Sequence, residues 1–398
     1  MKIGNRAYIG VWTGIGLTFS SMVGTGVFTS LGYQISDHSS LWSIVLLWVI
    51  GGFTAFTGGI CYYQLIKQYP DSGGEVHFIN ELYGSKLSIV VALLSIVFGF
   101  AAPVALAALA VASYIQLYVP FAATQIALVT IIAVSGIHLL SLQISSIAQR
   151  ILFLLKIGLI VVFICAAIPH MDVSTTAWQM SESHLQHLLS GKFFIALMFV
   201  HYSYSGWNTC IYVFREMRNR RTFFLSLFIS VILVTVLYVL LNVSFISVSG
   251  LANLRGVTEV GQRAAYDLFG AQVGAIFSTL IGILLIANIS AMIWSGSRVS
   301  LKTEEILCKR SNNKPIPSKH ILLLMLVSLL FVLVSNFESL LITTSFILSL
   351  SMILVIGSLA FHSNKSIFKL RITTRLCAVF FCIITLVSNF YYLYNEFS

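Results

Sequence analysis

Long apolar stretches follow one another along almost the whole chain. A helix needs roughly 20 predominantly apolar residues to cross a lipid bilayer, and the sequence contains eleven such stretches. They cover residues 8–31, 41–66, 87–118, 124–142, 151–168, 193–214, 223–247, 264–297, 321–335, 340–361 and 376–394. We therefore expect an all-α polytopic membrane protein in which residues 1–398 form a single transmembrane domain.

The composition and the placement of charge support this class. Hydrophobic residues make up 58% of the chain and charged residues only 9%, which is too little polar surface to cover a soluble core. The net charge of +10 follows from orientation, not from a nucleic acid partner. If the N-terminus is cytoplasmic, 20 of the 23 Lys and Arg residues fall on that side, as the positive-inside rule requires. We expect a cell (inner) membrane protein with its C-terminus outside.

Side chains suited to catalysis or metal binding are scattered. The six cysteines fall in spans or in one cytoplasmic loop, so we expect no disulfide. The sequence has no CxxC pair and no histidine cluster with metal-ligand spacing. A membrane enzyme would need a nucleophile, metal ligands or paired carboxylates that converge. We therefore expect no catalytic residue, no metal and no cofactor.

Small and polar residues interrupt the first and sixth spans. The interruptions are SSMVGTGVF, residues 20–28, and HYSYSGWN, residues 201–208. They lie five spans apart, and an odd number of spans inverts the second copy of a repeat. Paired interruptions in inverted halves indicate a transporter site near the membrane midplane. We predict inverted halves at residues 8–169 and 192–361, then an extra span and an extracytoplasmic C-terminus at 372–398.

The first interruption has two interpretations. Small residues can allow two helices to pack closely. Alternatively, the segment is unwound, and its free amide groups bind a carboxylate with help from the positive end of the following half-helix. Gly24, Thr25 and Gly26 would then receive the carboxylate, and the carbonyl groups of Ser21 and Met22 would accept from an ammonium group. A side chain at Gly26 would fill the space that the carboxylate needs.

Five stretches resemble the amino acid–polyamine–organocation (APC) superfamily, close to bacterial L-amino-acid-transporter-like members. They occur in register as GTGVF (24–28), YPDSGGEVHF (69–78), YSYSGWN (202–208), FREMRN (214–219) and SRVSLKTEE (297–305). The resemblance implies a five-plus-five inverted repeat (LeuT-like) with discontinuous spans 1 and 6, plus one extra C-terminal span. Arg215 and Arg220 depart from the family pattern, which has Glu and Pro there, and most relatives have twelve spans.

The resemblance also implies roles around the sixth span. Tyr202 would be the aromatic lid that closes over the substrate from outside, and carbonyl groups near Tyr202, Ser203 and Ser205 would accept from the substrate ammonium. Tyr202 and Trp207 both lie too deep in the sixth span to belong to an interfacial belt of aromatic residues. We expect both to gate the site, together with Tyr238 of span seven. Related acid-resistance antiporters carry Glu at position 208. The neutral Asn208 of this chain argues against the exchange reaction of those antiporters.

Lys156 has two interpretations. It lies six residues after Arg150, about 9 Å of helix rise, so its side chain could snorkel to the cytoplasmic surface. By resemblance, it instead fills the place where sodium-coupled relatives bind a cation and bonds carbonyl groups of the unwound first span. In that case Lys156 is a coupling residue, transport is sodium-independent, and protons become a candidate coupled ion.

The acidic residues bear on substrate charge. All thirteen fall in loops or at span ends, and a cationic side chain in the membrane would require a carboxylate. We therefore expect a secondary active or facilitative amino acid transporter that works by alternating access on neutral substrates. A polyamine or cationic amino acid carrier is the alternative within transport, and a transport-like amino acid receptor is the alternative of another class. The oligomeric state is not predicted.

Overall fold

The computed structural model describes residues 9–397 except 37–38, 72, 117–118, 141, 172–185, 187, 189, 309–317 and 362–370. The N-terminal segment that we expect in the cytoplasm, and the first residue of the predicted first half, therefore lie outside the described residues. The extreme C-terminal residue lies outside them as well.

Helices form almost all of the described part of the chain, and no β-strand occurs in it. The first half contains α1 (Val11–Met22), α2 (Thr25–Thr29), α3 (Leu31–Gln34), α4 (Leu41–Gln68), α5 (Gly74–Tyr83), α6 (Ser85–Leu94), the π-helical η1 (Ser95–Ala101), α7 (Ala102–Ile115), α8 (Ala123–Leu140) and α9 (Leu142–Ala167). The second contains α11 (Gly191–Tyr204), α12 (Thr209–Tyr212), η5 (Phe214–Glu216), α13 (Arg220–Ser249), α14 (Leu251–Leu254), α15 (Val260–Cys308), α16 (Ser318–Val334) and α17 (Phe337–Phe361). The last helix is α18 (Ile372–Phe397).

Eight helical segments in the described residues are long and apolar enough to cross a membrane. The shorter apolar helices at Ala123–Leu139 and Ser318–Val334 match the expected fourth and ninth spans, and α11 with α12 occupies the expected sixth. The count of eleven spans stays a prediction. The helix at the expected eighth span is longer than the predicted range, because α15 runs from Val260 to Cys308 with a break in helical geometry at Gly270.

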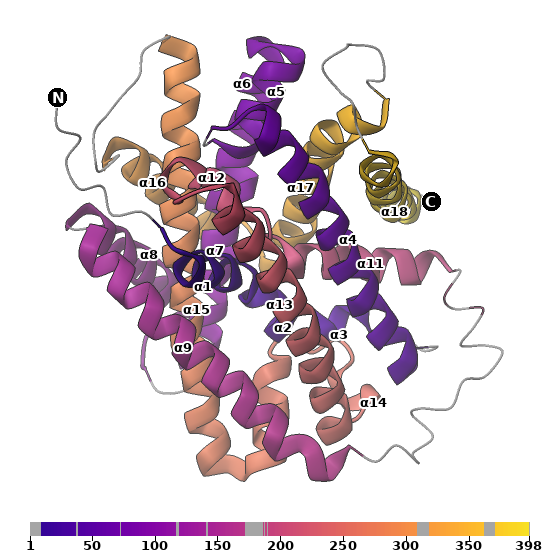
Figure 1. Ribbon diagram of the computed structural model, residues 1–398. Helices are drawn as coiled ribbons and strands as arrows, with labels where there is room; N and C mark the ends of the chain where they lie inside the picture. Colours follow the sequence, from indigo (N-terminus) through magenta and orange to yellow (C-terminus); the bar gives the residue numbers. More distant parts are fainter. Residues whose placement is uncertain are drawn as a thin grey trace.

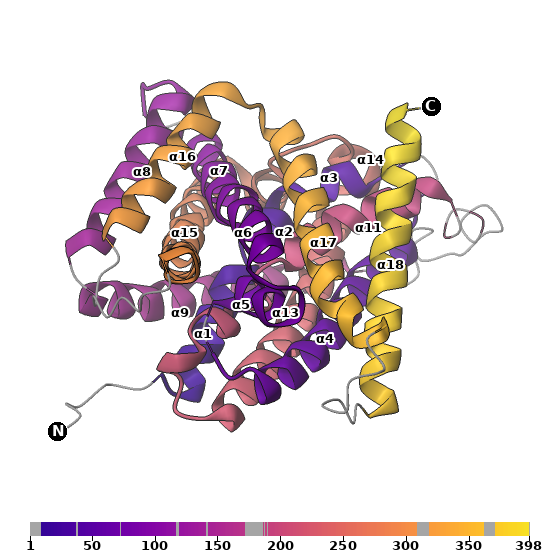
Figure 2. The ribbon, with the colours of Figure 1, turned by 90° about the horizontal axis from the view of Figure 1, so that it is seen from above.

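The first span lies inside the bundle. Figure 1 shows α1, α2 and α3 near the centre, and α1 packs against α9, α13 and α15. Around this centre, α4 packs against α11, α13 and α18, and α7 packs against α8 and α15. Seen from above, α17 and α18 lie side by side at the edge opposite α8 and α16 (Figure 2). The interrupted helix is thus enclosed by other spans, which is where irregular backbone is tolerated in a membrane protein.

Both interrupted spans are broken where the sequence predicts. Between α1 and α2 the backbone leaves the helical region at Val23 (φ −76°, ψ 92°) and Gly24 (φ −142°, ψ −144°). Between α11 and α12 it does so at Ser205 (φ −55°, ψ 142°) and at Gly206, whose φ of +97° is left-handed. The prediction of two discontinuous helices is confirmed.

The two breaks also contact each other. A Cβ atom added at Gly206 would lie 2.7 Å from the carbonyl oxygen of Ser21. Position 206 therefore needs glycine for two reasons: its left-handed backbone and the close approach of the first span.

We expect Gly206→Ala to lower the stability of the protein and reduce transport. The left-handed conformation alone costs an L-residue roughly 1–2 kcal/mol, and the new methyl group would also push against Ser21. Thermal unfolding of the detergent-purified protein measures the loss. Gly136→Ala is the matched control, because the backbone of Gly136 is helical and a Cβ there meets nothing within 4 Å. Equal melting temperatures for Gly206→Ala and wild type would contradict the argument.

Candidate functional site

The break in the first span exposes backbone groups that a continuous helix would pair. Gly24 has no side chain to cap α2, and the first amide groups of any helix lack partners within that helix. These amides, from Thr25 onward, provide donors beside the break. On the other side of the break, the carbonyl groups of residues 20–23 have lost their helical partners and need donors.

Lys156 from α9 supplies one donor. Its ammonium donates to the carbonyl oxygens of Ser20, at 3.5 Å, and of Val23. The side chain is fully buried, with 0% of its surface exposed. The snorkelling interpretation is therefore wrong, and the expected contact of Lys156 with the unwound span is present.

Tyr238 from α13 joins the two breaks. Its hydroxyl donates to the carbonyl oxygen of Met22 at 2.7 Å and lies 3.0 Å from that of Ser203. One side chain thus ties the unwound end of α1 to the end of α11. The carbonyl of Met22, expected to receive the substrate ammonium, already has this partner, although an oxygen with two lone pairs can accept a second bond.

Asn288 from α15 is a member of the site that the sequence did not identify. With its amide nitrogen turned toward the first span, it donates to the carbonyl oxygens of Ser21 at 3.2 Å and Ser20 at 3.3 Å. A Cβ added at Gly24 would lie 2.5 Å from the Asn288 amide. Nothing in the pattern of α15 separates this asparagine from one that contacts a neighbouring helix, so only the fold reveals its role.

Thr25 and Tyr202 meet across the breaks. Their hydroxyl oxygens lie 3.4 Å apart, and both side chains are buried. Thr25 begins α2, and Tyr202 lies in the last turn of α11. The aromatic ring assigned to the lid is thus next to the amide groups of the first break.

Other predicted site residues serve packing in this structure. The Ser203 hydroxyl donates to the carbonyl oxygen of Phe199 at 2.9 Å and lies 3.0 Å from the hydroxyl oxygen of Ser30. A Cβ at Gly26 would lie 2.5 Å from the Ser203 Cα atom. A side chain at Gly26 would therefore also force α2 away from α11, besides filling the space expected for a carboxylate. The Ser21 hydroxyl bonds the carbonyl oxygen of Leu17 in its own helix.

Trp207 lies on the α4 side of the second break. It is buried, its ring centroid is 4.9 Å from that of Tyr62, and it contacts the place where a Cβ of Gly58 would be. The structure therefore places Trp207 against the second span, and its gating role stays a prediction.

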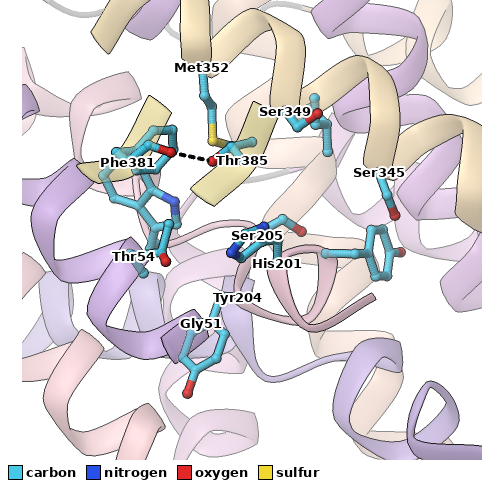
Figure 3. A pocket seen from close by; sticks show the side chains of 14 residues that line it. Gly51, Thr54, His201, Tyr204, Ser205, Ser345, Ser349, Met352, Phe381 and Thr385 are labelled. Atoms are coloured by element: carbon cyan, nitrogen blue, oxygen red, sulfur yellow. Dashed lines mark hydrogen bonds between the residues drawn. The ribbon is translucent and has the colours of Figure 1, made fainter. Parts of the chain in front are cut away.

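Two cavities flank the break in the sixth span, and Ser205 lines both. The first lies among α4, α11, α17 and α18, with the side chains of Thr54, His201, Ser349 and Thr385 around it (Figure 3). The second is bounded by Ser205 and Gly206 from the break, by residues of η1, α15 and α17, and by Glu75. Ser205 is thus the predicted site residue that faces open space on both sides.

Glu75 shows that an acidic residue between two spans can be buried beside the site. Although it belongs to the segment between the second and third spans, it is 4% exposed and lies against Asn208, just beyond the second break. The feature of the sequence that indicates this burial is the pair of glycines directly before Glu75. Gly73 and Gly74 have φ of +118° and +60°, and a Cβ at Gly74 would collide with Tyr212. These glycines let α5 turn back and dock against the bundle.

Ion pairs join the helices beyond this cavity. Asp71 receives Lys302 Nζ at 2.8 Å and also pairs with Arg215. Arg298 Nε lies 2.7 Å from a carboxylate oxygen of Glu216. Arg215, which departs from the family pattern, thus pairs with the loop before α5, and Glu216 holds α15.

Comparisons with known proteins agree with this geometry. The amino acid permease family model matches residues 9–397. The b(0,+)-type amino acid transporter 1 of Homo sapiens is 25% identical over 248 residues, 60% of this chain and 51% of that protein. The large neutral amino acids transporter small subunit 2 of Homo sapiens is 21% identical over 302 residues, 73% of this chain and 56% of that protein. The chain spans about half the length of the curated relatives it matches.

A solved structure shows the same fold. The crystal structure of MhsT in complex with L-phenylalanine superposes with a TM-score of 0.70 at 14% identity, covering 98% of this chain and 99% of that one. The expected LeuT-like fold is thereby confirmed, and its relatives are membrane transporters, not enzymes. This chain is a multi-pass membrane protein that belongs to the amino acid permease family of the APC superfamily.

Proposed function

We propose that this protein is a secondary active or facilitative transporter that carries amino acids across the plasma membrane by alternating access. The observation that carries the proposal is the contact between two broken helices, in which Gly206 of the expected sixth span lies against Ser21 of the expected first span. Such paired breaks place backbone donors and acceptors together inside a membrane protein. The names of the relatives, and the L-phenylalanine bound to MhsT, support an amino acid as substrate.

The amino acid backbone would bind between the breaks. Its carboxylate would take the free amides between Gly24 and Gly26, with the Thr25 hydroxyl beside them. Its ammonium would donate to carbonyl groups of the first span at Ser21 and Met22, and of the sixth span near Tyr202 and Ser205. Tyr202 would close over the substrate, and Trp207 and Tyr238 would adjust the two breaks as the site opens.

Sodium would have no place in this cycle. The Lys156 ammonium already bonds two carbonyl groups of the unwound span, where a cation would otherwise be needed. We infer sodium-independent transport, with protons as the candidate coupled ion. The predicted inverted halves, 8–169 and 192–361, would supply the two parts that move relative to each other, with the N-terminus in the cytoplasm and the C-terminus outside.

The choice between neutral and cationic substrates changes with the structure. The sequence favours neutral substrates because all acidic residues fall in loops or at span ends. Glu75, buried beside the second break, removes that reason and favours the cationic alternative. A receptor that binds without transport is the remaining alternative, and flux measurements separate it from a carrier.

Purified protein in liposomes tests the proposal. Uptake of radiolabelled amino acids is measured with and without internal substrate and with and without sodium. A carrier gives saturable uptake above that of empty liposomes, unchanged by sodium. Saturable binding without uptake would support the receptor, and neither binding nor uptake of any amino acid would refute the proposed function.

Lys156→Ala should weaken substrate binding roughly 10- to 150-fold, because the carbonyl groups of Ser20 and Val23 would lose their donor. Hydrogen bonds from a charged group contribute about 1.5–3 kcal/mol, which corresponds to this range. Affinity is measured across several pH values without sodium, in wild type and variant. Lys67→Ala is the control, since Lys67 lies over the Tyr63 ring at the end of α4. Identical affinity curves for Lys156→Ala and wild type would remove Lys156 from the mechanism.

Tyr238→Phe should weaken substrate binding about 2- to 10-fold, in line with the roughly 0.5–1.5 kcal/mol of one neutral hydrogen bond. The ring stays in place, but the bond that ties Met22 to the sixth span is lost. Tyr83→Phe is the control, since Tyr83 is exposed and its hydroxyl bonds the carbonyl oxygen of Leu354 at 3.2 Å. Equal effects of both variants in isothermal titration would deny Tyr238 a specific role.

A further inference from the structure

Glu75 places a buried carboxylate among three neutral donors. Its Oε1 accepts from the Tyr62 hydroxyl at 2.9 Å and from the Asn208 amide, and its Oε2 accepts from the Tyr212 hydroxyl at 2.6 Å. The donors come from α4, from the start of α12 and from its end. The carboxylate is therefore held in one position by three separate anchors.

No cation balances this carboxylate among the residues that the structure describes. The nearby basic side chains have other acidic partners: Arg215 and Lys302 pair with Asp71, and Arg298 pairs with Glu216. A buried charge is costly unless it is paired and hydrogen-bonded. The structure supplies the hydrogen bonds and leaves the countercharge to come from elsewhere.

The carboxylate keeps room for one more donor. Each carboxylate oxygen accepts about two hydrogen bonds, so Oε1 is saturated by Tyr62 and Asn208, whereas Oε2 has one acceptor position left beside Tyr212. Glu75 also lines the second cavity. The remaining acceptor position therefore belongs to a side chain that borders empty space.

The same cavity reaches the second of the two breaks between which the amino acid backbone is proposed to bind. Ser205 and Gly206 line one part of it, and Glu75 another. The rest of the lining includes the apolar side chains of Phe100, Met292 and Met352 and the polar side chains of Ser95 and Ser351. A lining that combines apolar side chains with a carboxylate suits a substrate side chain that has an aliphatic stem and a cationic tip.

We propose that Glu75 is the cation-binding end of the substrate cavity, and that the protein selects amino acids with a side-chain ammonium or guanidinium group. The inference rests on the proposed function, because it assumes that the substrate backbone binds at the helix breaks. It names the charge of the substrate and the residue that recognises it.

A purely structural role for Glu75 makes a different prediction. If the carboxylate only docks α5 against α4 and α12, glutamine should serve nearly as well, because it has the same shape and keeps one acceptor oxygen. If the negative charge binds the substrate, glutamine should lose cationic substrates and keep neutral ones.

L-lysine and L-norleucine are the matched probes, since they share a four-carbon stem and differ in the terminal ammonium. Affinities and uptake are measured with wild type, Glu75→Gln and Glu81→Gln in liposomes. Glu81 is the control because it lies in the same helix with its side chain exposed. We expect the wild-type protein to prefer lysine. Glu75→Gln should lower the affinity for lysine about tenfold or more and change the affinity for norleucine by no more than about twofold. Glu81→Gln should behave as the wild type does.

Each contrary result has a separate meaning. Equal loss of lysine and norleucine in a folded Glu75→Gln would make Glu75 structural and overturn the inference. Norleucine uptake without lysine uptake in wild type would overturn it while the proposed function stands. If Glu75→Gln does not fold, Glu75→Asp is measured instead. This variant retains the negative charge, so it must still bind lysine more tightly than norleucine. A reversed preference would refute the inference. Absence of uptake of any amino acid would refute the proposed function itself.

Discussion

Unpaired backbone groups at the two helix breaks are the constraint on which the rest of the site depends. The hydrocarbon region offers no water to satisfy them, so the protein must supply partners. Lys156, Tyr238 and Asn288 do so for the carbonyl groups of residues 20–23. These three side chains come from α9, α13 and α15, so satisfying one short segment brings three further spans to the centre of the bundle.

The sequence predicts the breaks because their signal is local. Small and polar residues interrupt an apolar stretch, and this pattern needs no knowledge of neighbouring helices. It leaves open whether a glycine allows packing or exposes backbone, and here both interpretations apply. Gly24 and Gly26 pack against Asn288 and Ser203, while the same stretch leaves the first amides of α2 uncapped. The two roles can be told apart only when the position of the neighbouring helix is known.

The sequence could not assign Glu75 to the site, because residue counting measures depth along a span and places Glu75 beyond the end of the second one. The glycine pair that turns α5 inward is visible in the sequence, but the position that it gives α5 depends on Tyr212, far along the chain. Lys156 is the opposite case. Its spacing from Arg150 favours the surface, and only the family resemblance predicted its contact with the first span.

The sixth span carries no acidic residue at its break, but a carboxylate from another element lies against it. The amide of Asn208 donates to the Glu75 carboxylate. Four residues before Glu75, Asp71 pairs with Arg215 and Lys302. The loop before α5 is thus held by the ion pairs of Asp71 with Arg215 and Lys302, and the first turn of α5 by the hydrogen bonds that Glu75 accepts. These contacts lie on the two sides of the turn at Gly73 and Gly74, so together they fix the position of the buried carboxylate relative to α4, α12 and α15.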